Sequence, residues 1–173
     1  MEKILKFVLL LLVCVNANAQ SNFPKDGDNI RNSNLDKFIG TWVWKNGNDE
    51  LVFILKKENV KILPTAKIYG DVLYGFHKFV KDGRELENST QYRQAKYGDK
   101  KHTFFSLGGD KSSELSIGIV HLSKNKNVNG YIEYLDSNRI KLVKLENLQG
   151  LMLGNGKYDY GISLPQNIIL TRQ

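Results

Sequence analysis

Short runs of β-branched and aromatic residues, each ended by residues typical of tight turns, follow one another from Thr41 to Arg172. Asn46-Gly47 and Asp82-Gly83 are the clearest turns, because such pairs tolerate the positive φ that a two-residue hairpin needs. No stretch after Leu35 shows the period of an amphipathic helix. The pattern therefore predicts an all-β fold of eight or nine short strands.

The expected strands are joined mostly by short turns, which favours an antiparallel meander that closes into a β-barrel. Closure removes the unpaired sheet edges that would otherwise invite aggregation. A β-sandwich is the alternative. The strands are expected at residues 41–45, 50–57, 71–80, 84–88, 102–107, 114–122, 131–135, 139–146 and 168–172.

The N-terminus has the features of an export signal. Lys3 and Lys6 precede an apolar run at residues 7–15, and a small residue, Ala19, ends the segment. The apolar run is too short to span a membrane. We therefore expect residues 1–19 to be removed as a signal peptide. The mature chain would then lack a transmembrane segment and lie in the periplasm, in the cell envelope or outside the cell.

Cys14 lies at a depth where bacterial lipoproteins are acylated, but the preceding Val13 is larger than a lipobox allows. We therefore do not expect lipid anchoring. Without Cys14 the mature chain has no cysteine, so its stability must come from a hydrophobic core. Residues 20–34 are polar and are expected to form a flexible lead-in. Residues 35–173 are long enough for one domain and too short for two.

The chain is basic, with a formal net charge of +7. Such a charge could attract anionic partners. The lysines, however, are scattered through strands and turns, which is typical of a solvated surface. We therefore expect no nucleic-acid partner, and we expect a monomer.

The residues Phe38-Ile39-Gly40-Thr41-Trp42 resemble the Gly-x-Trp signature of the first strand of lipocalin and calycin barrels. In that superfamily the Trp fills the closed end of the barrel, and an Arg or Lys of the last strand packs across it. The resemblance implies that Gly40, Trp42 and Arg172 close the barrel. A guanidinium over an indole ring gains about 1–2 kcal/mol when desolvated. The paired cysteines and the middle motif of lipocalins have no clear counterpart here.

A second resemblance rests on three segments: Ala19-Gln20, the block Leu-Asp-Lys-Phe-Ile-Gly-Thr-Trp at residues 35–42, and the tail at residues 164–173. This layout is similar to a family of small exported proteins of Bacteroidetes-type bacteria whose function is not known. Many relatives carry a lipobox cysteine immediately before the Ala-Gln pair, where this chain has Asn18. The resemblance implies an exported protein and a barrel, and it implies no activity.

The sequence shows no catalytic constellation. His77, His102 and His121 lie on separate expected strands without the spacing of metal ligands. No serine lies in a Gly-x-Ser-x-Gly elbow, and the mature chain offers no thiolate. Glu85 and Glu87 would share a strand face, as solvated acids on an edge strand also do. We therefore predict no catalytic residue, no metal, no cofactor and no enzymatic activity.

Two functions remain open. The first is a non-enzymatic barrel that binds a small apolar or amphipathic molecule in its interior. The second is a module that binds an envelope protein or a glycan through its loops at residues 92–101 and 147–161, as an inhibitor for example. Aromatic rings on the strands could also form an exposed surface that stacks sugars, although we expect them in the core. The interior residues expected to contact an apolar ligand are Phe53, Leu73, Phe104 and Ile117.

Overall fold

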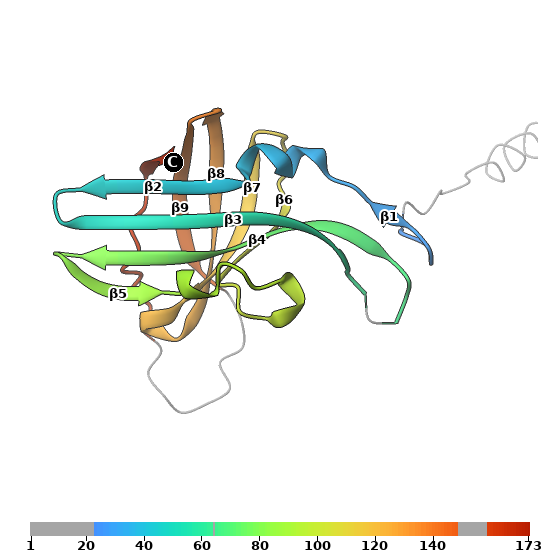
Figure 1. Cartoon of the computed structure of the whole chain (residues 1–173), viewed down its shortest axis with the longest axis horizontal. Helices are drawn as coiled ribbons and strands as arrows, with labels where there is room; N and C mark the ends of the chain where they lie inside the picture. Colours follow the sequence, from blue (N-terminus) through green and yellow to red (C-terminus); the bar gives the residue numbers. More distant parts are fainter. Residues whose placement is uncertain (1–22, 64, 149–158) are drawn as a thin grey trace, which may run out of the picture.

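The computed structural model describes residues 23–63, 65–148 and 159–173. Within these ranges the chain is built almost entirely of strands, with four short 3₁₀ helices (Figure 1). The helices are η1 (Ser33–Phe38), η2 (Thr90–Tyr92), η3 (Tyr97–Asp99) and η4 (Leu122–Lys124). The strands are β1 (Asn29–Ile30), β2 (Gly40–Asn46), β3 (Asp49–Lys61), β4 (Tyr69–Lys81), β5 (Arg84–Asn88), β6 (Phe104–Gly108), β7 (Glu114–His121), β8 (Lys126–Asp136), β9 (Arg139–Asn147) and β10 (Ile168–Arg172).

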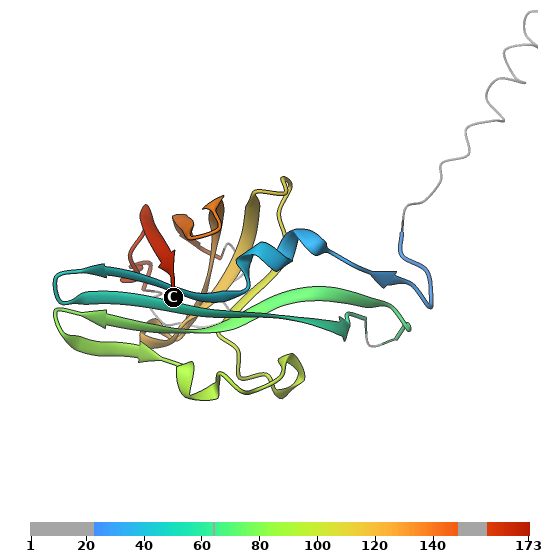
Figure 2. The same ribbon diagram turned by 45° about the horizontal axis from the view of Figure 1, so that its top comes forward.

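Eight of these strands form a closed antiparallel barrel, so the predicted all-β meander is confirmed and the sandwich alternative is not adopted. Each barrel strand pairs with the next along the chain, with β5 left outside and β4 pairing directly with β6. The barrel closes where β10 pairs with β2, at Arg172 opposite Trp42. Figure 2 shows β2, β3 and β4 crossing the steeper strands β7, β8 and β9.

The barrel interior is filled by a large cluster of buried apolar side chains. They come from alternate positions of the strands, as one face of a pleated sheet requires. Leu35 and Phe38 of η1 add to the cluster from one end. Buried members from the strands include Trp42, Leu51, Phe53, Leu55, Leu73, Phe79, Phe104, Leu115, Ile117, Ile119, Val128, Ile132, Ile140, Leu142, Leu145 and Leu170.

Arg172 and Trp42 meet at the η1 end of the barrel. The guanidinium carbon lies 4.1 Å from the centre of the fully buried indole ring. The ring nitrogen of Trp42 donates to the carbonyl of Phe38 at 2.8 Å, and Arg172 donates to the carbonyl of Ile39 at 2.5 Å. Gly40 has a φ of +137°, and a Cβ there would come within 2.5 Å of Arg172 Nη1. Only glycine therefore fits beneath the arginine.

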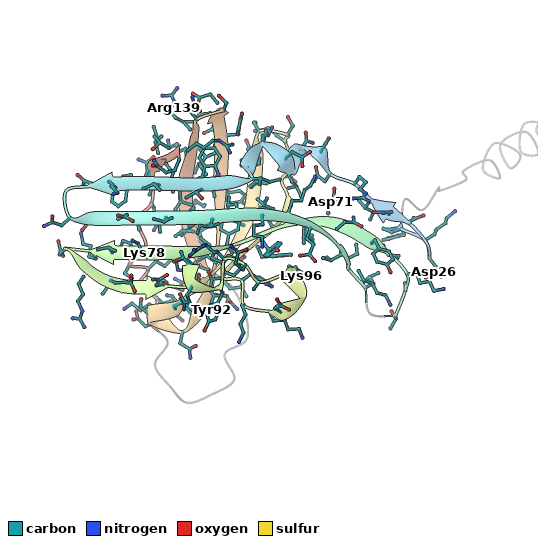
Figure 3. All side chains as sticks on the ribbon, in the orientation of Figure 1. Asp26, Asp71, Lys78, Tyr92, Lys96 and Arg139 are labelled. Carbon is teal, nitrogen blue, oxygen red and sulfur yellow. The ribbon has the colours of Figure 1, made fainter. Side chains whose placement is uncertain are left out.

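Part of the segment expected to be a flexible lead-in is tied to the barrel. β1 pairs in parallel with the start of β4, on a part of β4 that extends beyond the barrel (Figure 1). There the carboxylate of Asp71 accepts hydrogen bonds from the backbone N–H of Asn32 at 3.0 Å and from Asn59 Nδ2 at 2.9 Å (Figure 3). Burial acts to raise the pKa of Asp71, but these hydrogen bonds and nearby Lys57 outweigh it and lower the pKa.

Candidate functional site

Two adjoining hollows lie on the outer wall of the barrel, over β6, β7 and β8. They have volumes of about 390 and 340 Å³. Phe105, Gly118 and Asn129 line both of them, one residue from each strand. These residues are cross-strand partners, so they form one row on the outer face. We call this region, with Tyr97, His102 and Tyr131 at its margins, the outer groove.

Gly118 forms the floor of the outer groove. It pairs with Phe105 on β6 and with Asn129 on β8, next to a register shift in β6 between Phe105 and Gly108, and a Cβ built on it would meet nothing within 4 Å. Other strand glycines differ, because a Cβ at Gly75 would lie 2.3 Å from a backbone oxygen and one at Gly130 would lie 2.4 Å from another. A strand glycine usually marks a bulge, a bend or a close approach of ligand or backbone. At Gly118 no described backbone approaches the position of a Cβ in the way it does at Gly75 and Gly130.

Aromatic rings form one wall of the outer groove. The rings of Tyr97 and His102 are stacked, with centroids 4.7 Å apart and planes 16° from parallel. Phe105 lies next to them, 6.2 Å from Tyr97. Among the described residues, His102 Nδ1 is the buried side-chain nitrogen or oxygen that lacks a hydrogen-bond partner. Burial lowers the pKa of His102, so the ring is neutral at physiological pH.

Contacts beneath the loop that follows β5 hold Tyr97 in place (Figure 3, where Tyr92 and Lys96 mark this loop). Glu58 Oε2 accepts hydrogen bonds from the backbone N–H of Tyr97 at 3.0 Å and from the hydroxyl of Tyr74 at 3.1 Å. Burial and the neighbouring Glu58 carboxylate raise the pKa of Tyr74 to about 12. The Tyr74 hydroxyl therefore stays protonated and keeps donating to Glu58.

The opposite wall of the outer groove is polar. Asn127 and Asn129 are exposed on β8, and Glu146 is exposed on β9. Tyr131 is 46% exposed and also borders a third hollow of about 350 Å³ that Glu133 helps to line. An aromatic wall facing amide and carboxylate groups can stack a flat ring and hydrogen-bond its substituents at the same time.

The four residues predicted to line an interior ligand site do meet inside the barrel. Phe53, Leu73 and Phe104 are fully buried and Ile117 is 3% exposed, and all four belong to the core cluster. The rings of Phe53 and Phe104 pack against each other with centroids 5.4 Å apart. Ile117 also borders the 390 Å³ outer hollow.

Both loops predicted as binding surfaces reach the outer groove. Residues 92–101 supply Tyr97, and Leu148 of the second loop lines the smaller hollow. Residues 149–158 of that second loop lie outside the described ranges. Some of the strand aromatics expected in the core lie there, and others lie on the outer wall. Phe104 is buried, whereas Phe105 and Tyr131 face the outer groove.

A second polar centre lies where β5 meets β4, η4 and the end of β7, and the Glu87 side chain is fully buried there. Its carboxylate accepts hydrogen bonds from His77 Nε2 at 2.8 Å, the Ser123 hydroxyl at 2.6 Å and the Leu122 N–H at 2.9 Å. His121 Nδ1 lies 2.5 Å from the same carboxylate. Burial acts to raise the pKa of Glu87, but these hydrogen bonds, that of His121 above all, outweigh it and hold the pKa well below its ordinary value.

The sequence did not indicate this centre. Glu85 and Glu87 were expected to share a face, but a register shift pairs Val80 with Glu85 and Phe79 with Glu87, which leaves Glu85 exposed. His121 comes from the end of β7, 34 positions further along the chain. The spacing of Glu87 and His121 along the chain does not indicate that their side chains lie together. No group of His, Cys, Asp and Glu in the described ranges could hold a metal ion.

The comparison with known families is decided by one match. A family model described as a family of unknown function (DUF6705) matches residues 1–173. The chain belongs to this family. Searches of curated proteins and of solved structures returned no match. The predicted membership of a family of unknown function is therefore confirmed. The match to DUF6705 does not address a Bacteroidetes-type origin or export. No helix in the described ranges is long and apolar enough to cross a membrane.

Proposed function

We propose that this chain is a binding protein that holds a neutral glycan in the outer groove. The observation that carries the proposal is the open space above Gly118, in a strand where a side chain would otherwise be expected. Sugars present a C–H face that packs on aromatic rings and hydroxyls that hydrogen-bond to amides and carboxylates. Phe105 on one side and Asn129 on the other supply these two kinds of contact.

Other ligand classes fit the outer groove less well. A peptide cannot add as a strand there, because β7 is already paired with both β6 and β8. A phosphate-rich ligand would meet the carboxylate of Glu133, which points outward on β8, whereas Glu146 on β9 is already paired with Lys144 at 2.6 Å. A neutral sugar avoids both problems.

An apolar ligand inside the barrel is the competing proposal. The residues expected to contact such a ligand are already packed in the core cluster. They are Phe53, Leu73, Phe104 and Ile117. An interior ligand would have to displace some of these side chains. The outer groove requires no such rearrangement, so we favour it.

The setting of this function is also a proposal. The signal-like residues 1–19 support an exported protein, Val13 before Cys14 supports the absence of a lipid anchor, and the resemblance at residues 35–42 and 164–173 supports a Bacteroidetes-type bacterium. The arrangement of Gly40, Trp42 and Arg172 supports a relation to lipocalin-like barrels. A glycan-binding role fits such a location and requires no catalytic group.

Filling the outer groove tests the proposal directly. Gly118→Phe adds a β-forming side chain where a Cβ meets nothing, so the melting midpoint should stay within about 2 °C of the wild type. Leu86→Phe is the control, because Leu86 is 37% exposed on β5. The probe is an array of neutral oligosaccharides, followed by calorimetric titration of the sugars that bind.

We expect the wild type and Leu86→Phe to bind at least one sugar, and Gly118→Phe to bind it at least about 10-fold more weakly. The proposal fails if the wild type binds none of the sugars. It also fails if Gly118→Phe, still folded, binds as well as the wild type.

A further inference from the structure

Three side chains that are distant in the sequence form a hydrogen-bonded series on the side of the barrel where the loop before β10 passes. The hydroxyl of Ser163 lies 3.2 Å from His121 Nε2. On the other side of the same ring, His121 Nδ1 lies 2.5 Å from Glu87 Oε1. A nucleophile bonded to a base, with the base oriented by a carboxylate, is the arrangement that activates a serine in acyl transfer.

The neighbouring hydrogen bonds fix which ring nitrogen carries the proton. The backbone N–H of Ser163 points to His121 Nε2 at 3.1 Å, and an N–H can only donate. Nε2 therefore bears the lone pair, and Nδ1 bears the proton that it donates to Glu87. This is the tautomer that a general base needs, because the unprotonated Nε2 also faces the Ser163 hydroxyl, which shares this acceptor with the Ser163 N–H.

Ser163 differs in exposure from the two residues behind it. The side chains of His121 and Glu87 are fully buried, whereas Ser163 is exposed. Water therefore competes little for the carboxylate and the ring, while a substrate can reach the hydroxyl. Glu87 keeps its charge in this position because His77 and Ser123 also donate to it.

The segment before Ser163 is held by contacts that do not involve His121. Lys126 Nζ donates to the carbonyl of Asp159 at 2.7 Å and to that of Gly161 at 2.8 Å, and Asn147 Nδ2 donates to the carbonyl of Tyr160 at 2.9 Å. These three hydrogen bonds fix the segment that leads into Ser163. Positioning of this kind is what an activated nucleophile requires.

We propose that Ser163 is a nucleophile for acyl transfer from esters of small carboxylic acids, with His121 as general base and Glu87 as the residue that positions it. Ser163 Oγ forms a bond to the ester carbonyl carbon as its proton passes to His121 Nε2. The bond from that carbon to the alcohol oxygen then breaks, and the alcohol leaves with the proton from Nε2. Water, deprotonated by the same nitrogen, releases the acid and restores Ser163.

The proposal goes beyond glycan binding and contradicts the prediction from sequence that the protein is not an enzyme. Ser163 does not lie in an elbow motif, so this series could not be predicted from the order of Glu87, His121 and Ser163 along the chain. Such series are recognised by geometry and not by order along the chain.

Diisopropyl fluorophosphate is a suitable probe, because an activated serine displaces its fluoride and keeps the phosphoryl group. The full-length protein is treated with the reagent, and the adduct is located by peptide mass mapping. We expect one adduct, at Ser163. Ser163→Ala should lose it while melting like the wild type, because the backbone N–H to His121 Nε2 remains. Ser112→Ala, at an exposed turn, is the matched control and should keep it.

Hydrolysis of p-nitrophenyl acetate gives a second readout. The wild type and Ser112→Ala should turn over the ester at least about 10-fold faster than Ser163→Ala. The proposal is overturned if Ser163 is not labelled, if other serines are labelled equally, or if Ser163→Ala hydrolyses the ester as fast as the wild type. Gly118→Phe should keep the label, and Ser163→Ala should keep any glycan affinity, so the two proposals can fail separately.

Discussion

Trp42 shows how one residue joins several distant parts of the chain. Its ring lies under Arg172 of the last strand and donates to the carbonyl of Phe38 in η1. Arg172 in turn donates to the carbonyls of Lys37 and Ile39, at 2.8 and 2.5 Å. The start of the domain and its last strand are therefore fixed to the same indole.

Trp42→Ala should lower the free energy of unfolding by about 3–5 kcal/mol, because it leaves a cavity and removes the surface on which Arg172 packs. Trp44 is only half-buried on the same strand, so Trp44→Ala should cost less than about 2 kcal/mol. Urea unfolding measures both. Equal losses in the two variants would contradict a special role for Trp42.

Glu87 should make stability depend on pH in the acid range. Its pKa in the folded protein lies below the ordinary value of 4.5, so its stabilising contribution is complete above about pH 4.5 and declines as the pH falls. Glu87→Gln should be less stable than the wild type near neutral pH, because an amide group would face donors such as the Leu122 N–H. The difference should shrink as the pH falls toward about 3. Parallel stability curves from urea titrations at several pH values would contradict this account.

Among the elements, the strands could be predicted because turn pairs and β-rich runs alternate along the chain. The start of β8 could not be predicted in this way. It was expected at residues 131–135 but begins at Lys126, because Asn127 and Asn129 face outward and made its first half look like a turn. β3 likewise extends to Lys61, where β4 continues beyond the barrel to pair with it.

The candidate sites were harder to predict than the strands. The outer groove needs Phe105, Gly118 and Asn129 in one row, and that row exists only after the strand register is known. A glycine inside a strand run was the one local sign. The series that ends in Ser163 unites three segments whose spacing follows no motif. By contrast, a family resemblance paired Trp42 with Arg172, and the structure places the two in contact.

At the scale of the whole molecule, the barrel depends on β10, which bridges β2 and β9. Leu170 on this strand is fully buried, whereas its neighbour Ile169 is 45% exposed. The two positions thus offer a matched pair of substitutions on opposite faces of the closing strand.

Leu170→Asp should open the barrel, because a carboxylate would be buried without a partner and the edges of β2 and β9 would be released. We expect aggregates or an unfolded chain in size-exclusion chromatography with light scattering. Ile169→Asp should remain a folded monomer like the wild type. A monomeric Leu170→Asp with an unchanged melting midpoint would show that β10 does not close the barrel.

The pairing of β10 with β2 also sets the order of events during folding. Thr171 contacts Val43, 128 positions away in sequence, so the ring joins residues from nearly opposite ends of the domain. Contacts of this range are slow to form, because a long loop must be ordered before any pairing compensates for it. The earlier strands can pair as hairpins on their own, but the ring cannot close until residues 168–172 reach β2. Until then β2 presents a bare edge on which a neighbouring chain can pair, so closure by β10 also guards against association.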